Sequence, residues 1–222
     1  MSRLLPLSIC LVAFALPASA DPVLAKMKAF SSDGPLYAYE MTYADTEMTA
    51  TGEIDPSRPE GERIQITSPD EDAWSDDFEE SLKQMEADTD GDIWCTSFAE
   101  RVPDSAELVS SDAAKATYSF APVPEDDADS REKKMMKRID GTITVDKTDG
   151  AVLGFNMRLP KPYKPAIVAK INVFEMTATC ARAPDGRTYV EAFSMNISGS
   201  AMSQSFEESV TRTITKLLGE VG

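Results

Sequence analysis

Apolar residues alternate with polar ones along most of this chain, which is typical of β-strands that bury one face. Two of the clearest runs are followed by Asp149-Gly150 and Asp185-Gly186. Glycine accepts the positive φ of a tight reversing turn, so these pairs indicate hairpins. The pattern predicts strands over residues 36–44, 46–54, 63–67, 92–101, 114–121, 143–145, 152–159, 170–182 and 189–198.

Three segments change to a spacing of three or four between apolar residues, which predicts amphipathic helices. The first helix begins at Asp21-Pro22, where the aspartate can act as N-cap and proline fits the first helical position. The second covers residues 73–87, and the third covers 203–218, where Ser205 and Glu208 match a capping box. The apolar stripes are Val23, Leu24, Met27 and Phe30; Trp74, Phe78, Leu82 and Met85; and Phe206, Val210, Ile214, Leu217 and Val221.

These elements together predict a single α+β domain over residues 21–222, because the chain contains no clear internal repeat and no long linker. We expect a strongly curved antiparallel sheet, a half-barrel, with helices packed on its concave face. Residues 122–129 are acidic and 131–138 are basic, so this stretch could form one further helix with acids first and bases last.

The first twenty residues are typical of a cleaved signal peptide. Arg3 precedes an apolar run from residue 4 to 16, and Ala18-Ser19-Ala20 supplies the small residues of a cleavage site. Cys10 follows Ile9, where a lipoprotein cleavage site requires a small residue, so we expect no lipid anchor. The prediction is a periplasmic or secreted protein with residues 1–20 removed.

The charge and the cysteine content of the chain indicate which ligands are unfavourable and whether a disulfide forms. The chain has 22 basic and 38 acidic residues, a formal net charge of −16, or −17 once Arg3 is removed with the leader. This acidity opposes binding of the chain as a whole to nucleic acid or to an anionic membrane. Cys95 and Cys180 remain after cleavage, and two cysteines in apolar strand patterns of an exported protein predict one disulfide.

The sequence contains no histidine, which removes the commonest general base and metal ligand. No nucleophile motif or phosphate-binding glycine loop is present either. We therefore predict a protein that is not an enzyme and that has no cofactor and no metal site. Asp88, Asp90 and Asp92 have the spacing that begins a calcium loop, but Ile93 and Ala99 stand where such a loop needs glycine and glutamate, which favours a turn after the helix.

Two basic clusters interrupt the acidic background. The second mixes prolines and an aromatic residue with lysines and could meet lipid headgroups or an acidic partner, and an ordinary solvated loop is the alternative. The first cluster comprises Arg131, Lys133, Lys134, Lys137 and Arg138. The second comprises Arg158, Lys161, Lys164 and Lys170, interleaved with Pro160, Pro162, Tyr163 and Pro165.

One local motif resembles a known family. Thr51-Gly52-Glu53-Ile54, then Ser57-Arg58-Pro59, then residues 64–70 (IQITSPD) match the glycine strand, Arg-Pro turn and proline–acid corner of the LolA/LolB type of periplasmic lipoprotein carrier. The order of predicted elements is also similar. The turn over residues 59–63 is longer than in that family, and the predicted 73–87 helix is unusually acidic.

The resemblance implies an incomplete barrel around a cavity for acyl chains, with helices as a lid. It implies that Arg58 corresponds to the turn arginine that controls the lid. If the protein is such a carrier, we expect the proline–lysine corner to present Tyr163, Lys161 and Lys164 at the cavity mouth. The expected function is a non-enzymatic carrier or binding protein for lipid or lipidated protein, with transient contacts to a membrane or an envelope protein. A ligand-free envelope scaffold is the alternative.

Overall fold

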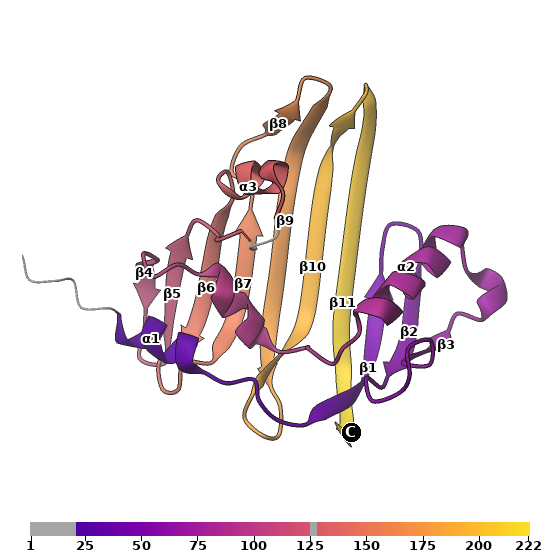
Figure 1. Cartoon of the computed structure of the whole chain (residues 1–222), viewed down its shortest axis with the longest axis horizontal. Helices are drawn as coiled ribbons and strands as arrows, with labels where there is room; N and C mark the ends of the chain where they lie inside the picture. The colour runs from indigo at the N-terminus through magenta and orange to yellow at the C-terminus, as the bar shows by residue number, and fades with distance from the viewer. Residues whose placement is uncertain (1–20, 125–127) are drawn as a thin grey trace, which may run out of the picture.

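The structure, a computed structural model, describes residues 21–124 and 128–222, so the predicted signal peptide lies outside it. Within these ranges the fold is α+β, with helices on one side of a single antiparallel sheet of 11 strands (Figure 1). The α+β class and the antiparallel sheet are confirmed. The sheet is not closed or strongly curled, so the expectation of a strongly curved half-barrel is wrong.

The strands follow one another across the sheet in the order β3-β2-β1-β11-β10-β9-β7-β6-β5-β4, and β8 pairs with β9 outside this path. The C-terminal strand β11 therefore lies beside β1 and joins two meanders. The bounds are β1 Leu36–Ala44, β2 Thr49–Ile54, β3 Ile64–Ser68, β4 Glu107–Ser111, β5 Lys115–Phe120, β6 Asp140–Asp146, β7 Val152–Arg158, β8 Tyr163–Ala166, β9 Ala169–Arg182, β10 Thr188–Ala201 and β11 Gln204–Val221.

The two faces of the sheet differ because apolar residues alternate with threonine, serine and asparagine. On the outer face these polar side chains bond across strands, as between Thr117 and Thr144 (3.1 Å) and from Asn156 to Thr177 (2.9 Å). The apolar residues point to the inner face, which carries the helices (Figure 1). Period-2 alternation thus decides which face of the sheet the helices cover.

The helices begin at the caps that the sequence supplies. They are α1 Pro22–Ala29, η1 Glu71–Ala73, α2 Asp76–Asp88, η2 Cys95–Arg101 and α3 Ser130–Met136, where η denotes a 3₁₀ helix. Asp21 Oδ1 caps α1 by accepting hydrogen bonds from the backbone N–H groups of Val23 (2.8 Å) and Leu24 (3.4 Å), and it also accepts one from the Tyr118 hydroxyl (2.8 Å). Ser75 caps α2. The first two predicted helices are therefore confirmed.

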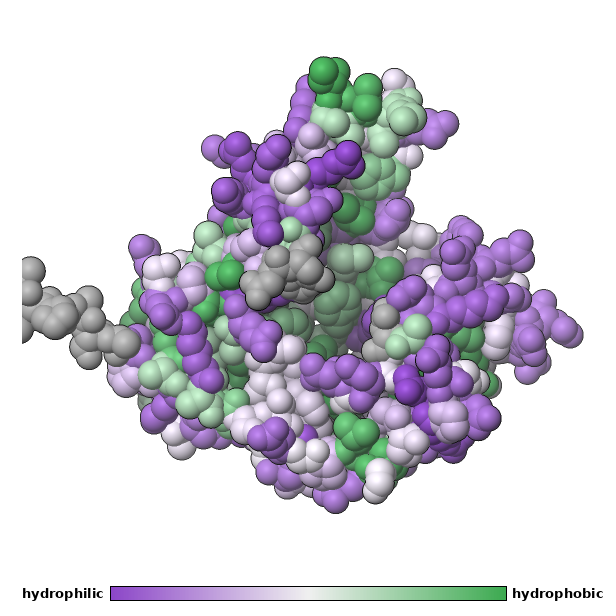
Figure 2. Space-filling view, in the orientation of Figure 1, coloured by the Kyte–Doolittle hydropathy of each residue, from purple (hydrophilic) through white to green (hydrophobic). Residues whose placement is uncertain are grey.

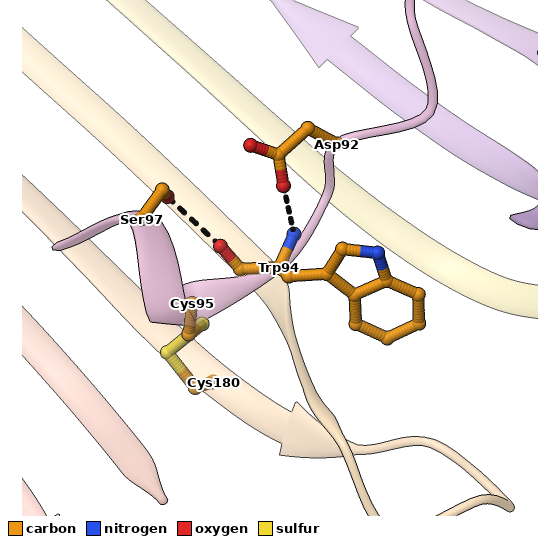
Figure 3. The surroundings of a disulfide bond; sticks show 5 residues. All are labelled: Asp92, Trp94, Cys95, Ser97 and Cys180. Carbon is orange, nitrogen blue, oxygen red and sulfur yellow. Dashed lines mark hydrogen bonds between the residues drawn. A yellow bond between two sulfur atoms is a disulfide. The ribbon is translucent and has the colours of Figure 1, made fainter. Parts of the chain in front are cut away.

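Residues 69–106, here called the crossing segment, connect the two edges of the sheet. They leave β3 at one edge and reach β4 at the other, and they carry α2 and η2 across the inner face (Figure 1). The predicted disulfide is confirmed, since Cys95 of η2 is bonded to Cys180 of β9 (Figure 3). In Figure 3 the chain around it is held by hydrogen bonds from Trp94 N to Asp92 and from the Ser97 hydroxyl to Trp94 O.

The main core lies between η2, α1 and strands β5, β6, β7 and β9. The Phe98 ring stacks on Phe155 with centroids 4.5 Å apart, and Phe120 packs beside it at 5.9 Å. The buried members of this cluster are Leu24, Met27, Cys95, Ala99, Val102, Ala116, Tyr118, Phe120, Ile139, Ile143, Val145, Val152, Phe155, Met157 and Ala178. Residues from α1, η2 and four strands thus share one core, which we call the packed half.

A buried arginine closes the lower end of the sheet, where β10 and β11 diverge beyond the pair Ala192–Thr213. The Arg187 guanidinium lies 3.5 Å from the Trp94 ring centroid and donates to the backbone oxygens of Ser32 (2.8 Å) and Pro35 (2.6 Å). It also donates to Asp185 Oδ2 through Nε (2.7 Å). One side chain therefore ties the α1–β1 loop, the crossing segment and the β9–β10 turn together.

The predicted closing helix over residues 203–218 is wrong, since this segment is the strand β11. Its apolar residues Phe206, Val210 and Ile214 are four apart, and a spacing of four fits a strand as well as a helix. The turn before it runs through Met202 and Ser203, whose φ angles are +50° and +71°. Because neither residue is glycine or asparagine, the turn carried no recognisable sequence signal.

Two other expectations change. The predicted strand over residues 92–101 is wrong, because η2 occupies most of it. Trp94 and Phe98 are apolar because this segment packs over the sheet as part of the crossing segment rather than within the sheet. In the stretch 122–138, α3 includes only the basic part and begins after the cap Asp129, while residues 125–127 lie outside the described ranges.

Candidate functional site

A groove of about 460 Å³ lies on the inner face between α2, the loop over residues 89–93 and the strands β1, β10 and β11. Its walls are mostly apolar, and strands from both sides of the β10–β11 junction contribute to its floor. The lining residues are Tyr39, Met41, Tyr43, Ile54, Ile64, Ser81, Gln84, Met85, Thr89, Asp90, Gly91, Asp92, Ile93, Phe98, Val190, Phe193, Val210, Arg212 and Ile214. Its size is within the range of about 300–1,000 Å³ usual for ligand sites.

The apolar floor continues from the groove toward the upper ends of β9, β10 and β11. Phe193 lines the groove, and Met195 and Ile197 follow it on the same face of β10. Their partners on β9 are Met176 and Phe174. These side chains are only half-buried, and Figure 2 shows apolar surface in the space between α3 and α2.

The interior of the groove is uncharged. Burial raises the pKa of the Tyr39 hydroxyl to about 12, and nearby Asp90 adds to this effect while Arg212 opposes it. Tyr39 is therefore neutral at physiological pH. The charged groups Arg212, Asp90 and Asp92 lie on residues that are exposed, at the mouth of the groove. An amphipathic molecule would match this arrangement, with its apolar part inside and its polar part outside.

The helix α2 covers one side of the groove and packs on the strands from β3 to β11. Phe78 is buried against Tyr43 with ring centroids 5.9 Å apart, and Trp74 meets Phe78 edge-on at 5.5 Å. Together with Met85 and Ala50 they form a core cluster that is separate from that of the packed half. The groove lies where these two clusters do not meet.

Polar contacts hold the C-terminal end of α2 to β3. Arg63 donates from Nη1 to the backbone oxygen of Thr89 (2.7 Å) and from Nε to that of Arg58 (3.1 Å). The backbone N–H of Ile64 donates to Glu86 Oε1 (3.0 Å). An arginine that satisfies carbonyl groups at a helix C-terminus also interacts favourably with the helix dipole.

The resemblance implies such a contact for Arg58, but in the structure the arginine that bonds a carbonyl group at the end of α2 is Arg63. Arg58 instead donates to Asp55 Oδ2 (3.1 Å), three residues earlier, at a partly exposed position. The Ser57 hydroxyl and Arg58 both hydrogen-bond this carboxylate and lower the pKa of Asp55. Arg63 was missed because a charged residue directly before a strand is no signal by itself; its partner lies 26 residues further along the chain.

The other predicted site residues lie at the opposite end of the sheet. Tyr163 is in β8 and pairs with Ile171 of β9, and Lys161 and Lys164 are exposed beside it. The two ends are separated by about 11 residues along β11, or about 35 Å. Arg58 and Tyr163 are therefore not part of one constellation, and the groove lies between them.

The two predicted basic clusters do come together. Helix α3 packs against β8, and the Arg138 guanidinium lies 5.9 Å from the centre of the Tyr163 ring. This places the basic residues of 131–138 beside those of 158–164 at the upper end of the molecule.

The aspartates after α2 stabilise turns. Asp90 Oδ1 accepts a hydrogen bond from Asp92 N (2.8 Å), and Asp92 Oδ1 accepts one from Trp94 N (3.1 Å). The side chain of Asp88 lies outside the described part of the structure. Within that part, no three histidine, cysteine, aspartate or glutamate side chains gather closely enough to hold a metal ion.

Comparison of the chain with protein-family models, with curated proteins and with solved structures finds no significant match. The described helices include none that is both long and apolar enough to cross a membrane.

Proposed function

We propose that this protein is an exported, non-enzymatic carrier or binding protein that holds a lipid, or the acyl chains of a lipidated protein, on the inner face of its sheet. The observation that carries the proposal is the apolar groove beside α2 together with the floor that extends from it. An acyl chain gains about 0.8 kcal/mol for each methylene group that leaves water, so a long apolar groove selects such ligands without specific polar contacts.

The methionines of the groove and floor support this type of ligand. Met41 and Met85 line the groove, and Met176 and Met195 belong to the floor beyond it. Methionine is unbranched and adapts its shape, which suits a flexible chain better than a ligand of fixed shape. The signal-like N-terminus and the disulfide support an oxidising compartment outside the cytoplasm.

Native mass spectrometry of gently prepared protein, followed by lipid extraction, tests the proposal. We expect apolar molecules to copurify and to compete with a fluorescent fatty acid for one site. If neither the purified protein nor its delipidated form binds the fatty acid, the carrier proposal is wrong and the ligand-free scaffold remains.

A matched pair of variants locates the site. Val210 and Thr211 are neighbours in β11, but Val210 lines the groove and Thr211 is exposed on the outer face. Val210→Trp fills part of the groove and should weaken fatty-acid binding at least tenfold. Thr211→Trp should leave it unchanged. Equal binding by the two variants would place the ligand elsewhere.

A further inference from the structure

The upper end of the sheet, here called the tip, consists of two reversing turns that lie side by side. The β8–β9 turn contains Ile167 and Val168, and the β10–β11 turn contains Met202 and Ser203. The backbone N–H of Met202 donates to the oxygen of Val168 (2.8 Å), so the two turns form one unit. Figure 1 shows these hairpins reaching beyond the other strands.

The side chains at the tip are large, apolar and exposed. Ile167 is 101% exposed, Met202 80% and Val168 59%. Turns of this kind usually carry glycine, asparagine or aspartate, which tolerate the backbone geometry and water. Figure 2 shows apolar surface at the top of the molecule, and the exposed fractions of the three side chains show that no other part of the described chain covers them. Isolated exposed apolar residues are common, but a group at the end of a projection indicates a contact site.

The charge of this end is opposite to that of the rest of the chain. Residues 150–174 contain Arg158, Lys161, Lys164 and Lys170 and no acidic residue, and residues 192–206 contain no charged residue at all. The whole chain carries a formal net charge of −16. The apolar side chains lie at the end of the tip and the basic side chains lie further from it. This arrangement matches a bilayer, whose anionic headgroups lie outside the acyl region.

We propose that the tip docks on an anionic phospholipid bilayer, with Ile167, Val168 and Met202 inserted at the level of the upper acyl chains and the lysines at the headgroups. The acidic remainder of the protein is repelled by the same surface, which orients the sheet with its tip toward the membrane. The apolar floor over Phe174 and Ile197 then runs from the bilayer toward the groove. The docking does not depend on whether the groove holds a ligand.

Flotation of the oxidised chain, residues 21–222, with vesicles tests this proposal. We expect binding to vesicles of equal parts phosphatidylglycerol and phosphatidylcholine, weakened by salt, and much weaker binding to phosphatidylcholine alone. The triple variant Ile167→Ser/Val168→Ser/Met202→Ser should bind at least tenfold more weakly. All three positions are exposed, so the variant should unfold at the parent's urea concentration.

Leu108 and Val109 provide a matched control. They are 52% and 55% exposed in β4, at the far edge of the sheet. Leu108→Ser/Val109→Ser removes exposed apolar surface without touching the tip and should bind vesicles as the parent does. Equal loss in both variants would show that general surface hydrophobicity, and not the tip, drives binding, and would overturn the proposal.

Insertion is tested separately with Ile167→Trp. Brominated acyl chains should quench its fluorescence beyond the quenching of the parent, whose tryptophans are Trp74 and Trp94. No additional quenching, or no binding of the parent to anionic vesicles, would overturn the proposal.

Self-association that disappears in the triple serine variant, without vesicle binding, would assign the tip to a protein partner instead. Fatty-acid binding measured without vesicles should be the same in the triple variant and the parent, which keeps this test distinct from that of the groove.

Discussion

The inner face of the sheet is covered in two different ways. In the packed half, η2 and α1 lie directly on β5, β6 and β7, and Phe155 is 2% exposed beneath them. Under α2 a smaller cluster packs on the strands from β3 to β11, and a groove remains beside it over β1, β10 and β11. Both halves have apolar strands, so strand composition does not explain the difference.

The difference arises from how each cover is attached. The cover of the packed half is fixed covalently by Cys95–Cys180, and Arg187 fixes its entry into the core through Trp94. The helix α2 is held by one apolar stripe and by polar contacts at its C-terminal end. A cover held by few contacts opens at a smaller cost in free energy, so α2 is the cover that would move if the groove takes up a ligand as proposed.

Removing the disulfide should have the largest effect on the difference between the two covers. Cys95→Ala/Cys180→Ala should lower the free energy of unfolding by about 4–5 kcal/mol, because the bond closes a loop of 85 residues. Urea denaturation measures this loss. Hydrogen exchange should then quicken in η2 and stay unchanged in α2. A loss below about 1 kcal/mol would show that packing alone fixes the cover.

Truncating one phenylalanine in each half compares the packing directly. Phe155→Ala leaves a cavity under Phe98 and should cost about 3–4 kcal/mol. Phe193→Ala changes a half-buried residue of the groove and should cost about 1 kcal/mol while weakening fatty-acid binding. Similar stability losses at both sites would mean that the groove is filled by the protein itself.

The sequence predicts the elements whose signals are local. The hairpins at Asp149-Gly150 and Asp185-Gly186 are correct because their glycines have φ near +90°, as the turns require. Helix α2 is correct because its apolar residues are spaced by four, four and three, which places them on one helical face. The C-terminal strand was missed because its four-residue spacing fits both periods, and the alternating Thr211, Thr213 and Thr215 were the better guide.

The site depends on contacts that no local pattern contains. The groove exists because residues 69–106 cross the sheet between its two edges and cover it only in part. A stretch of sequence does not reveal which strands such a segment will cover. Arg187 likewise follows an Asp-Gly turn and has the pattern of an ordinary surface residue, although its partners Ser32 and Pro35 bury it from more than 150 positions away.

Two arginines of the β9–β10 hairpin allow a buried position to be compared with an exposed one: Arg187 is buried and Arg182 is partly exposed. Arg187→Lys keeps the charge but loses the forked hydrogen bonds and the stacking on Trp94, so it should cost about 3 kcal/mol. Arg182 is partly exposed and pairs with Asp146 and Asp149 at the surface, so Arg182→Lys should cost less than about 1 kcal/mol. Equal unfolding midpoints for the two variants would contradict the role of Arg187.

Substitutions of the two arginines in the β2–β3 loop should have the smallest effect on stability, and they test whether α2 moves when a ligand enters the groove. Arg63→Gln removes the charged donor that holds the C-terminal end of α2 and should cost about 1–2 kcal/mol. Arg58→Gln removes a surface pair with Asp55 and should cost less than about 0.5 kcal/mol.

Because α2 borders the groove, Arg63→Gln should also speed both entry and release of a fluorescent fatty acid in stopped-flow measurements, whereas Arg58→Gln should leave both rates unchanged. If Arg58→Gln alone altered the rates, the turn arginine of the family resemblance would control the lid; if neither did, α2 would be a fixed wall of the groove and ligands would enter along the floor from the tip.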